Sequence, residues 1–588
     1  MTVGARPVDD RESTLGVATR APQAMRESDT LQCTRAASIT VPLAAGSIYA
    51  LLVAVLWLPF GSKSGMGYET TLVYLSESRS FVDGFFYDWD PLRHYMQLFY
   101  QVGYQLSNVM GIDGSFLGNQ LVYAALWWGR GFLTFLIIRR LFPSAPLLAY
   151  ATGALVVVHA SDHALNWVGQ LNQFGVMFWM LLAVYLLVVA LQQTTSGKTI
   201  VFTAAAAGAT YLCLWSYESP LFILVLAPAL LVPLVGLTRR TAAVCVAFYL
   251  IPLVFVLENL SRYVGNDAAT YQESVLRDDF APTRLMGDLV YNVRASIRFD
   301  KWGDLVPQVA SSHRAMLAGL VAASVFSLGA LLVSRIARRQ EEQVARRELA
   351  LLLSAGMMLL VASFPAYLAL EGPRSLWRTQ FLSGIGFGIA AAALLVLVAS
   401  PLSDRRVRVL LVVVGGAVIA YAGGSTAYRT AAYHFSVWER HREAMAQVLQ
   451  IAPRVRPETV IVLTNVPRGA DPFGHNMWFD VALRLAYPHT AVAGLYYYRG
   501  GKPAPGANLV VHDGMWKPTE TGFPTLLSGA PFSNTLIIRY SESGRPVLVK
   551  DVPSLLHAGN RAAASYDPDA AIEGREPSPL ATRRYGAS

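Results

Sequence analysis

The chain has 588 residues, of which 54% are hydrophobic and only 15% are charged, and its mean hydropathy is +0.38. Soluble domains carry charge on about a quarter of their residues, so this composition excludes an ordinary soluble protein. The net charge of +9 does not indicate a nucleic-acid partner, because arginine is concentrated in short connections between apolar segments, where it sets orientation in a membrane.

The start of the chain is predicted to be a disordered cytoplasmic tail. Residues 1–35 mix charged and hydroxyl side chains without a core pattern. The first apolar stretch, residues 37–60, is longer than a signal-peptide core and lacks a clear cleavage site, so we expect it to remain as an anchor. Cys33, Cys213 and Cys245 show neither zinc-site spacing nor a pair placed for an exported disulfide.

Apolar runs that can cross a hydrocarbon core of about 30 Å recur along the chain. Because the bilayer tolerates no unpaired backbone group, each run is predicted to be a helix. About eleven spans are expected. They cover residues 37–60, 116–138, 145–160, 171–191, 200–215, 220–237, 242–257, 315–333, 349–370, 381–399 and 409–428. The fold class predicted for residues 36–430 is an all-α polytopic membrane domain.

Short basic connections fall after alternate spans and therefore lie on one side of the membrane. They contain Arg139, Arg140, Lys198, Arg239, Arg240, Arg335, Arg338, Arg339, Arg346, Arg347, Arg405, Arg406 and Arg408. The positive-inside rule makes that side the cytoplasm. We therefore expect an integral protein of a bacterial cytoplasmic membrane, with a cytoplasmic N-terminus and an extracytoplasmic C-terminus. Arg130, inside the second span, is predicted to snorkel to the cytoplasmic surface.

The long polar insertions then lie outside the cytoplasm. Residues 61–114 and 258–314 form the outer loops, and residues 283–297 in the second loop are predicted to be an amphipathic interfacial helix. After the last span the pattern predicts a small extracytoplasmic α/β domain at residues 431–555, followed by a disordered tail at residues 556–588. Its elements are a polar helix at 438–450 and strands at 459–463, 507–511, 535–540 and 546–550.

The first outer loop holds three candidate catalytic carboxylates. Asp88 and Asp90 flank a tryptophan, and in an extended segment both face one way, as a shared divalent cation such as Mg²⁺ or Mn²⁺ would need. Glu69 follows the first span closely, where a partly desolvated carboxylate can deprotonate a hydroxyl group. The alternative is a solvated acidic loop whose aromatic neighbours form a membrane-interface belt.

Other candidates come from later outer turns. Asp162 and His163 follow the third span, and Glu218 precedes the sixth, where helix capping and the helix dipole are the alternative explanations. Arg374 and Arg378 lie in a short outer loop, where arginine is uncommon, and guanidinium suits a lipid phosphate. Pairing with an acid or anchoring at the interface is the alternative for these two.

The segment 93–189 resembles multispanning glycosyltransferases of the GT-C fold, the protein O-mannosyltransferase superfamily and its tetratricopeptide-bearing relatives. The resemblance lies in Leu92-Arg-His-Tyr, Ile138-Arg-Arg-Leu-Phe-Pro-Ser, His159-Ala-Ser-Asp-His-Ala-Leu-Asn-Trp and Ser216-Tyr-Glu-Ser. It implies that an acid early in the first outer loop is the base, which matches Glu69 in position, although the family has an acidic pair there. Asp88 and Asp90 remain rivals.

The resemblance further implies a polyprenyl-phosphate sugar as donor, with Arg374 and Arg378 on its phosphate. The cavity or acceptor site would contain Arg93, His94, Asp162, His163 and Glu218. The predicted function is therefore an inverting hexosyltransferase-like enzyme of the extracytoplasmic face, with a glycan or protein acceptor, membrane lipids as partners and no required cofactor. No P-loop, Gly-x-Ser-x-Gly or His-Glu-x-x-His motif occurs, which disfavours a nucleotide-driven pump and a serine hydrolase.

Three alternatives stay open. A transporter or flippase of lipid-linked sugars would place charges near the midplane on broken helices, often in repeated halves, whereas these acids gather at one face without an apparent repeat. An enzyme like an O-antigen ligase or polymerase would share the large outer loop and its arginines. An inactive paralogue would keep the scaffold alone.

Overall fold

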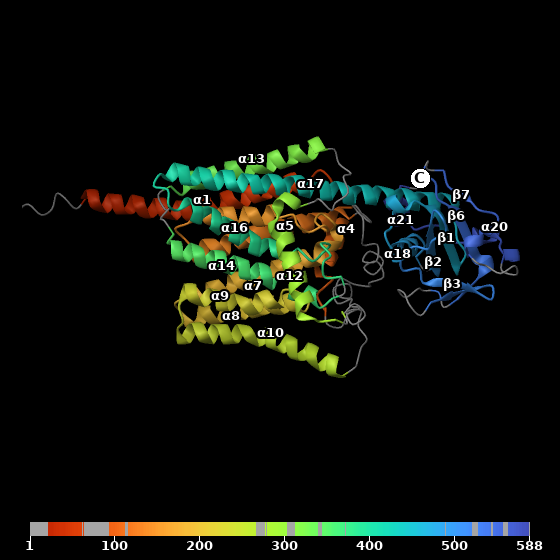
Figure 1. Ribbon diagram of the computed structural model, residues 1–588, viewed down its shortest axis with the longest axis horizontal. Helices are drawn as coiled ribbons and strands as arrows, with labels where there is room; N and C mark the ends of the chain where they lie inside the picture. The colour runs from red at the N-terminus through yellow and green to blue at the C-terminus, as the bar shows by residue number, and fades with distance from the viewer. Residues whose placement is uncertain are drawn as a thin grey trace, which may run out of the picture.

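The computed structural model forms a bundle of long helices with a smaller sheet domain at one end (Figure 1). The end of the bundle that faces this domain is called the domain end below. The structure describes residues 21–61, 63, 93–111, 116–265, 277, 279–302, 312–338, 344–370, 372–488, 490–519, 527, 529–542, 545–556 and 563–586.

Each predicted span corresponds to one apolar helix of the bundle, and several of these helices extend beyond the predicted bounds. The helices are α1 (Ala21–Trp57), α5 (Leu117–Leu141), α6 (Pro146–Val158), α7 (Leu171–Gln192), α8 (Ser196–Leu214), α9 (Leu221–Val235), α10 (Arg239–Gly265), α13 (Ser312–Ile336), α14 (Arg346–Ala362), α16 (Ser383–Ala399) and α17 (Arg405–Ile451). Among the described residues, eight helices are long and apolar enough to cross a membrane, and α6, α9 and α16 are shorter apolar helices. The chain is an integral membrane protein with an all-α spanning domain.

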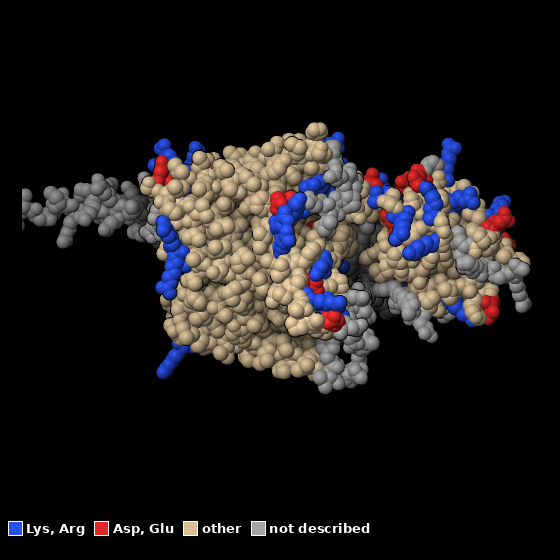
Figure 2. Space-filling view, in the orientation of Figure 1, with Lys and Arg blue, Asp and Glu red and all other residues tan. Residues whose placement is uncertain are grey.

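Charge is distributed unevenly along the bundle. Figure 2 shows mostly basic side chains on the end away from the sheet domain. Helices α5 and α13 carry arginines in their last turns, and α10, α14 and α17 each begin with an arginine. The prediction that the basic connections lie on one side of the membrane agrees with this distribution. The assignment of that side to the cytoplasm remains a prediction.

Small residues bring the central helices together. Every residue of α6 is buried, and α16 is buried over most of its length. A Cβ atom at Gly386 would lie 2.3 Å from the Leu360 nitrogen, and one at Gly356 would lie 2.6 Å from the Ala390 nitrogen. The backbones of α14 and α16 therefore touch, as small residues permit in membrane helices.

The last helix of the bundle leads directly into the sheet domain. The sequence predicts a span at 409–428 and a separate polar helix at 438–450, but α17 is one helix of 47 residues. At a rise of about 1.5 Å per residue it is about 70 Å long. Its apolar face continues past the bundle, since Trp438, Met445 and Val448 are buried against the sheet domain.

The sheet domain contains two sheets. The first has the order β2-β1-β6-β7, with β1 (Thr459–Val466) parallel to both β2 (Val492–Tyr498) and β6 (Thr535–Arg539), and β7 (Val547–Leu548) antiparallel at the edge. Nearly all of β1 is buried, which explains its continuous apolar run. A second, antiparallel sheet joins β3 (Leu509–His512), β4 (Met515–Pro518) and β5 (Ala530–Pro531). The sequence did not predict β2 or α18 (Asn476–Ala486), which connects β1 to β2.

The end of the chain differs from the expected disordered tail at 556–588. Helices α20 (Pro568–Ala571) and α21 (Pro579–Tyr585) pack on the domain. The guanidinium of Arg584 lies 4.2 Å from the ring centre of Phe116, at the start of α5, and 4.6 Å from that of Trp438 on α17. Short helices rich in Ala, Pro and Arg lack a strong apolar pattern, so only these tertiary contacts show that they are ordered.

Arg584→Ala is expected to destabilise the protein by about 2 kcal/mol, because a desolvated cation over aromatic rings is lost. Thermal unfolding of the protein purified in detergent measures the effect. Arg583, its exposed neighbour, is the matched control, and Arg583→Ala should leave the midpoint unchanged. Equal midpoints for the two variants would show that the contacts of Arg584 do not stabilise the domain.

Candidate active site

The candidate site is built on the loop of residues 372–382, called the arginine loop below, which carries Arg374 and Arg378 between α15 (Pro365–Leu368) and α16. The loop lies at the domain end, where Trp377 contacts His434 on α17 beyond the predicted last span. Figure 1 shows α4 (Leu98–Val109) and α12 (Pro282–Ile297) at the same end.

Asp162 holds one side of the arginine loop. Its carboxylate, in a residue 5% exposed, accepts hydrogen bonds from the backbone N–H groups of Ala164 (2.7 Å), Arg378 (3.0 Å) and Gln380 (3.1 Å). Burial raises the pKa of Asp162 to about 6, although the hydrogen bonds from these three N–H groups act to lower it. The carboxylate is therefore mostly ionised at neutral pH. Asp162, predicted as a cavity residue, thus anchors the loop that carries the arginines.

The backbone at Arg378 is strained. Its φ angle of +67° is in the left-handed region, which costs a residue with a side chain about 1–3 kcal/mol. The bond from its N–H to Asp162 and the bond that its carbonyl accepts from Gln173 Nε2 (3.4 Å) hold it there. Its guanidinium lies 5.3 Å from the ring centre of Trp167.

A helix predicted at 283–297 is confirmed as α12, and it holds the other side of the arginine loop. Its position at the membrane interface remains a prediction. Asp288, Asn292 and Ser296 are spaced four residues apart, so they share one face, and all three are buried. Asn292 donates to the Pro373 carbonyl (2.8 Å) and accepts from Gln380 Nε2 (2.8 Å), while Ser296 bonds the side-chain oxygen of Gln380.

Asp288 links two arginines that are far apart in the sequence. Its Oδ1 accepts from Arg374 Nε (2.7 Å), and its Oδ2 accepts from Arg277 Nη2 (3.0 Å). Desolvation alone would raise the pKa of Asp288, but the bonds from Arg374 and Arg277 outweigh it and lower the pKa. The Asp288 side chain is 7% exposed, whereas that of Arg374 is 62% exposed. Within the described part of the chain, Nη1 and Nη2 of Arg374 have no hydrogen-bond partner and are available to an anion.

Arg93 and Glu218, both predicted cavity residues, bind each other. Two parallel bonds join them, from Nε to Oε2 (3.1 Å) and from Nη2 to Oε1 (2.8 Å). Arg93 also lies 4.5 Å from the ring centre of Tyr217.

The two predicted histidines have different surroundings. His94 is half-buried next to Tyr95, with ring centres 6.5 Å apart. The backbone N–H of His163 donates to the Leu376 carbonyl (3.0 Å), and its carbonyl bonds His434 Nε2 (2.9 Å). Burial lowers the pKa of the His163 side chain, which is therefore neutral at pH 7. His163 thus joins the arginine loop to α17.

The expectation for Arg130 is wrong. Arg130 is 2% exposed and donates to the carbonyls of Val157 (2.9 Å) and His159 (3.4 Å) beneath the loop that contains Asp162. Its guanidinium satisfies the carbonyls left free where α6 ends, so it does not extend to a membrane surface.

Other predicted residues are untested. Glu69, Asp88 and Asp90 lie outside the described residues, so their roles as base or metal ligands remain predictions. The described residues contain no group of three or more His, Cys, Asp or Glu side chains that could hold a metal ion.

No family model matches this chain, and no curated protein matches it. Solved structures similar to it include ArnT from Cupriavidus metallidurans bound to undecaprenyl phosphate and the same protein in the apo state. The first has 16% sequence identity and a TM-score of 0.34, and covers 71% of this chain and 82% of that chain. The second has 15% identity and a TM-score of 0.35, with coverages of 71% and 81%. Similarity at this level assigns neither fold nor activity, so the function is argued from the site itself.

Proposed function

We propose that the protein is a GT-C-like membrane glycosyltransferase that transfers a sugar from a polyprenyl-phosphate donor to a glycan or protein acceptor on the extracytoplasmic face. The observation that supports this most is Arg374. A buried carboxylate fixes its Nε, while the rest of its guanidinium is exposed at the domain end of a membrane bundle. Such an arrangement suits a phosphate carried by a lipid, because a preoriented guanidinium binds phosphate oxygens through two parallel hydrogen bonds.

The reaction would proceed with inversion. Glu69 or Asp88 would take the proton of the acceptor hydroxyl, and the resulting oxygen would attack the anomeric carbon. The bond from that carbon to the phosphate oxygen would break, and polyprenyl phosphate would leave with the electron pair. Arg374 and Arg378 would stabilise the charge that grows on the phosphate, which is the kind of contribution that fixed charges make to a transition state. A divalent cation is not required by this scheme.

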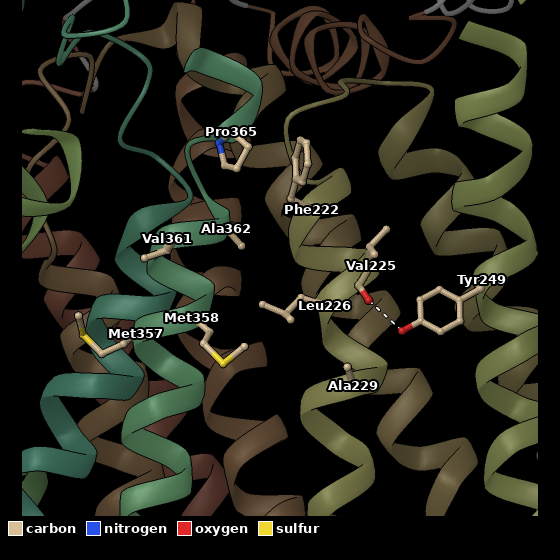
Figure 3. A pocket seen from close by; sticks show the side chains of 10 residues that line it. All are labelled: Phe222, Val225, Leu226, Ala229, Tyr249, Met357, Met358, Val361, Ala362 and Pro365. Atoms are coloured by element: carbon tan, nitrogen blue, oxygen red, sulfur yellow. Dashed lines mark hydrogen bonds between the residues drawn. The ribbon is translucent and has the colours of Figure 1, made fainter. Parts of the chain in front are cut away.

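An apolar groove beside the site would take the lipid tail. It has a volume of about 710 Å³ and lies between α9, α10 and α14, with Phe222, Tyr249, Met358 and Pro365 in its lining (Figure 3). Pro365 begins α15, and Arg277 donates to the carbonyls at the end of that helix, those of Leu368 (3.3 Å) and Ala369 (3.1 Å). The groove therefore connects through α15 and Arg277 to Asp288 and the phosphate-binding arginine.

Transfer of sugar from undecaprenyl-phosphate monosaccharides, assayed on the purified protein in detergent, tests the proposal. Arg374→Ala is expected to reduce the rate about 100-fold, as loss of one donor to a developing anion does. Arg284→Ala removes an exposed arginine of α12 whose partner is Asp279, and it should retain full activity. Unchanged activity of Arg374→Ala would exclude the proposed site. Absence of any transfer by the wild type in detergent, where no compartments exist, would favour the flippase alternative.

A further inference from the structure

Trp377 lies in the arginine loop between the two proposed phosphate-binding residues. Among the tryptophans that the structure describes, Trp377 alone is exposed, with 36% of its surface accessible. It lies three positions after Arg374 in the sequence, and Arg378 follows it directly. Three residues span at most about 10 Å, so an indole and a guanidinium on this loop can reach adjacent parts of one sugar phosphate.

The indole ring is fixed from behind. Its centre lies 5.4 Å from that of Trp167 and 5.2 Å from the ring centre of His434. Both supporting side chains are buried, Trp167 at 6% and His434 at 0% exposed. Two aromatic contacts therefore set the orientation of the ring while leaving part of its surface accessible.

The backbone around Trp377 is also fixed. The N–H of Trp377 donates to Ser375 Oγ (3.2 Å), and the carbonyl of Leu376 accepts from the His163 N–H (3.0 Å). Trp377 lies on this loop and packs against His434 of α17 where that helix leaves the bundle.

We propose that Trp377 is the platform on which the pyranose ring of the donor stacks while the arginines hold its phosphate. The apolar C–H face of a pyranose matches an indole face, and the preorganised ring loses little freedom when the sugar binds. This inference rests on the proposed function and adds to it a residue that recognises the sugar rather than the lipid phosphate.

Binding of sugar-bearing and sugar-free lipids to the purified full-length protein tests the platform. The probes are undecaprenyl phosphate and its glucose, mannose and galactose derivatives. Trp377→Leu is expected to lower the affinity for the best sugar-bearing probe roughly tenfold and to leave the affinity for undecaprenyl phosphate unchanged. Trp377→Phe should retain most of the affinity, because it keeps an aromatic plane. Phe280→Leu, which alters an exposed aromatic residue near the start of α12, should change neither affinity.

Two results would overturn the platform. One is an equal loss, or no loss, for both kinds of probe in Trp377→Leu. The other is a wild type that binds the best sugar-bearing probe no more tightly than undecaprenyl phosphate. The proposed function has a separate test in the same assay, because Arg374→Ala should weaken both kinds of probe. If Arg374→Ala weakens neither, the phosphate site itself is wrong, whatever Trp377→Leu does.

Discussion

Asp288→Ala is expected to destabilise the protein by about 3 kcal/mol and to abolish most of its affinity for undecaprenyl phosphate. The carboxylate is the shared partner of Arg277 and Arg374, and its side chain is only 7% exposed. Without it, two guanidiniums face each other without a counterion, and the Arg277 side chain, 13% exposed, has little access to water. Repulsion would displace the more exposed Arg374 from its phosphate-binding position.

Thermal unfolding and lipid binding in detergent measure the two consequences. Asp300→Ala is the matched control, because Asp300 forms an ion pair with Arg298 in which the two side chains are 56% and 39% exposed. Exposed pairs contribute less than about 1 kcal/mol, so the control should unfold and bind as the wild type does. If Asp288→Ala binds undecaprenyl phosphate with wild-type affinity, the link between this carboxylate and the phosphate site is refuted.

The sequence predicted the membrane scaffold because the signal for a span is contained in the span itself. A run of apolar residues of sufficient length must form a helix in a bilayer, whatever its neighbours are. The same reasoning predicted the helix α12 from its amphipathic pattern. Arg374 and Arg378 could be singled out because arginine is uncommon in a short outer loop.

The connections within the site could not be predicted in this way. In the sequence, Asp288 resembles any other acid on an amphipathic helix, because its partner Arg374 follows 86 residues later. Arg130 was misjudged because snorkelling is the usual outcome for arginine in a span. Its actual partners, the carbonyls at the end of α6, exist only once α5 and α6 pack together.

The sheet domain illustrates the same limit. Strand β1 was predicted because β-branched residues favour strands, and the structure adds that it is buried and parallel to its neighbours. Strand β2 contains three successive tyrosines, and its Gly494 packs against Phe479 and Leu483 of α18. A glycine within a strand weakens the local signal for a strand, and here tertiary packing compensates for it.

Asp162→Ala is expected to be strongly destabilising, by about 4 kcal/mol, since it leaves three backbone N–H groups without their acceptor and each buried loss costs about 1–3 kcal/mol. Those groups belong to Ala164, Arg378 and Gln380, so the substitution also detaches the arginine loop from the turn before α7. The left-handed backbone of Arg378 would then be held only by the bond from Gln173, and its strain would favour relaxation. Trp377 and both arginines would lose their fixed positions together.

Hydrogen exchange separates this local effect from general instability. In Asp162→Ala the amides of residues 376–380 should exchange faster than in the wild type under conditions where the bundle helices remain protected. Asp404→Ala is the control, because Asp404 accepts one backbone N–H at the exposed start of α17 and should cost about 1 kcal/mol without affecting the arginine loop. If exchange in the loop were unchanged in Asp162→Ala, Asp162 would not be the anchor, and the positions of the proposed phosphate and sugar residues would depend on the remaining contacts of the loop with α12, His163 and Gln173.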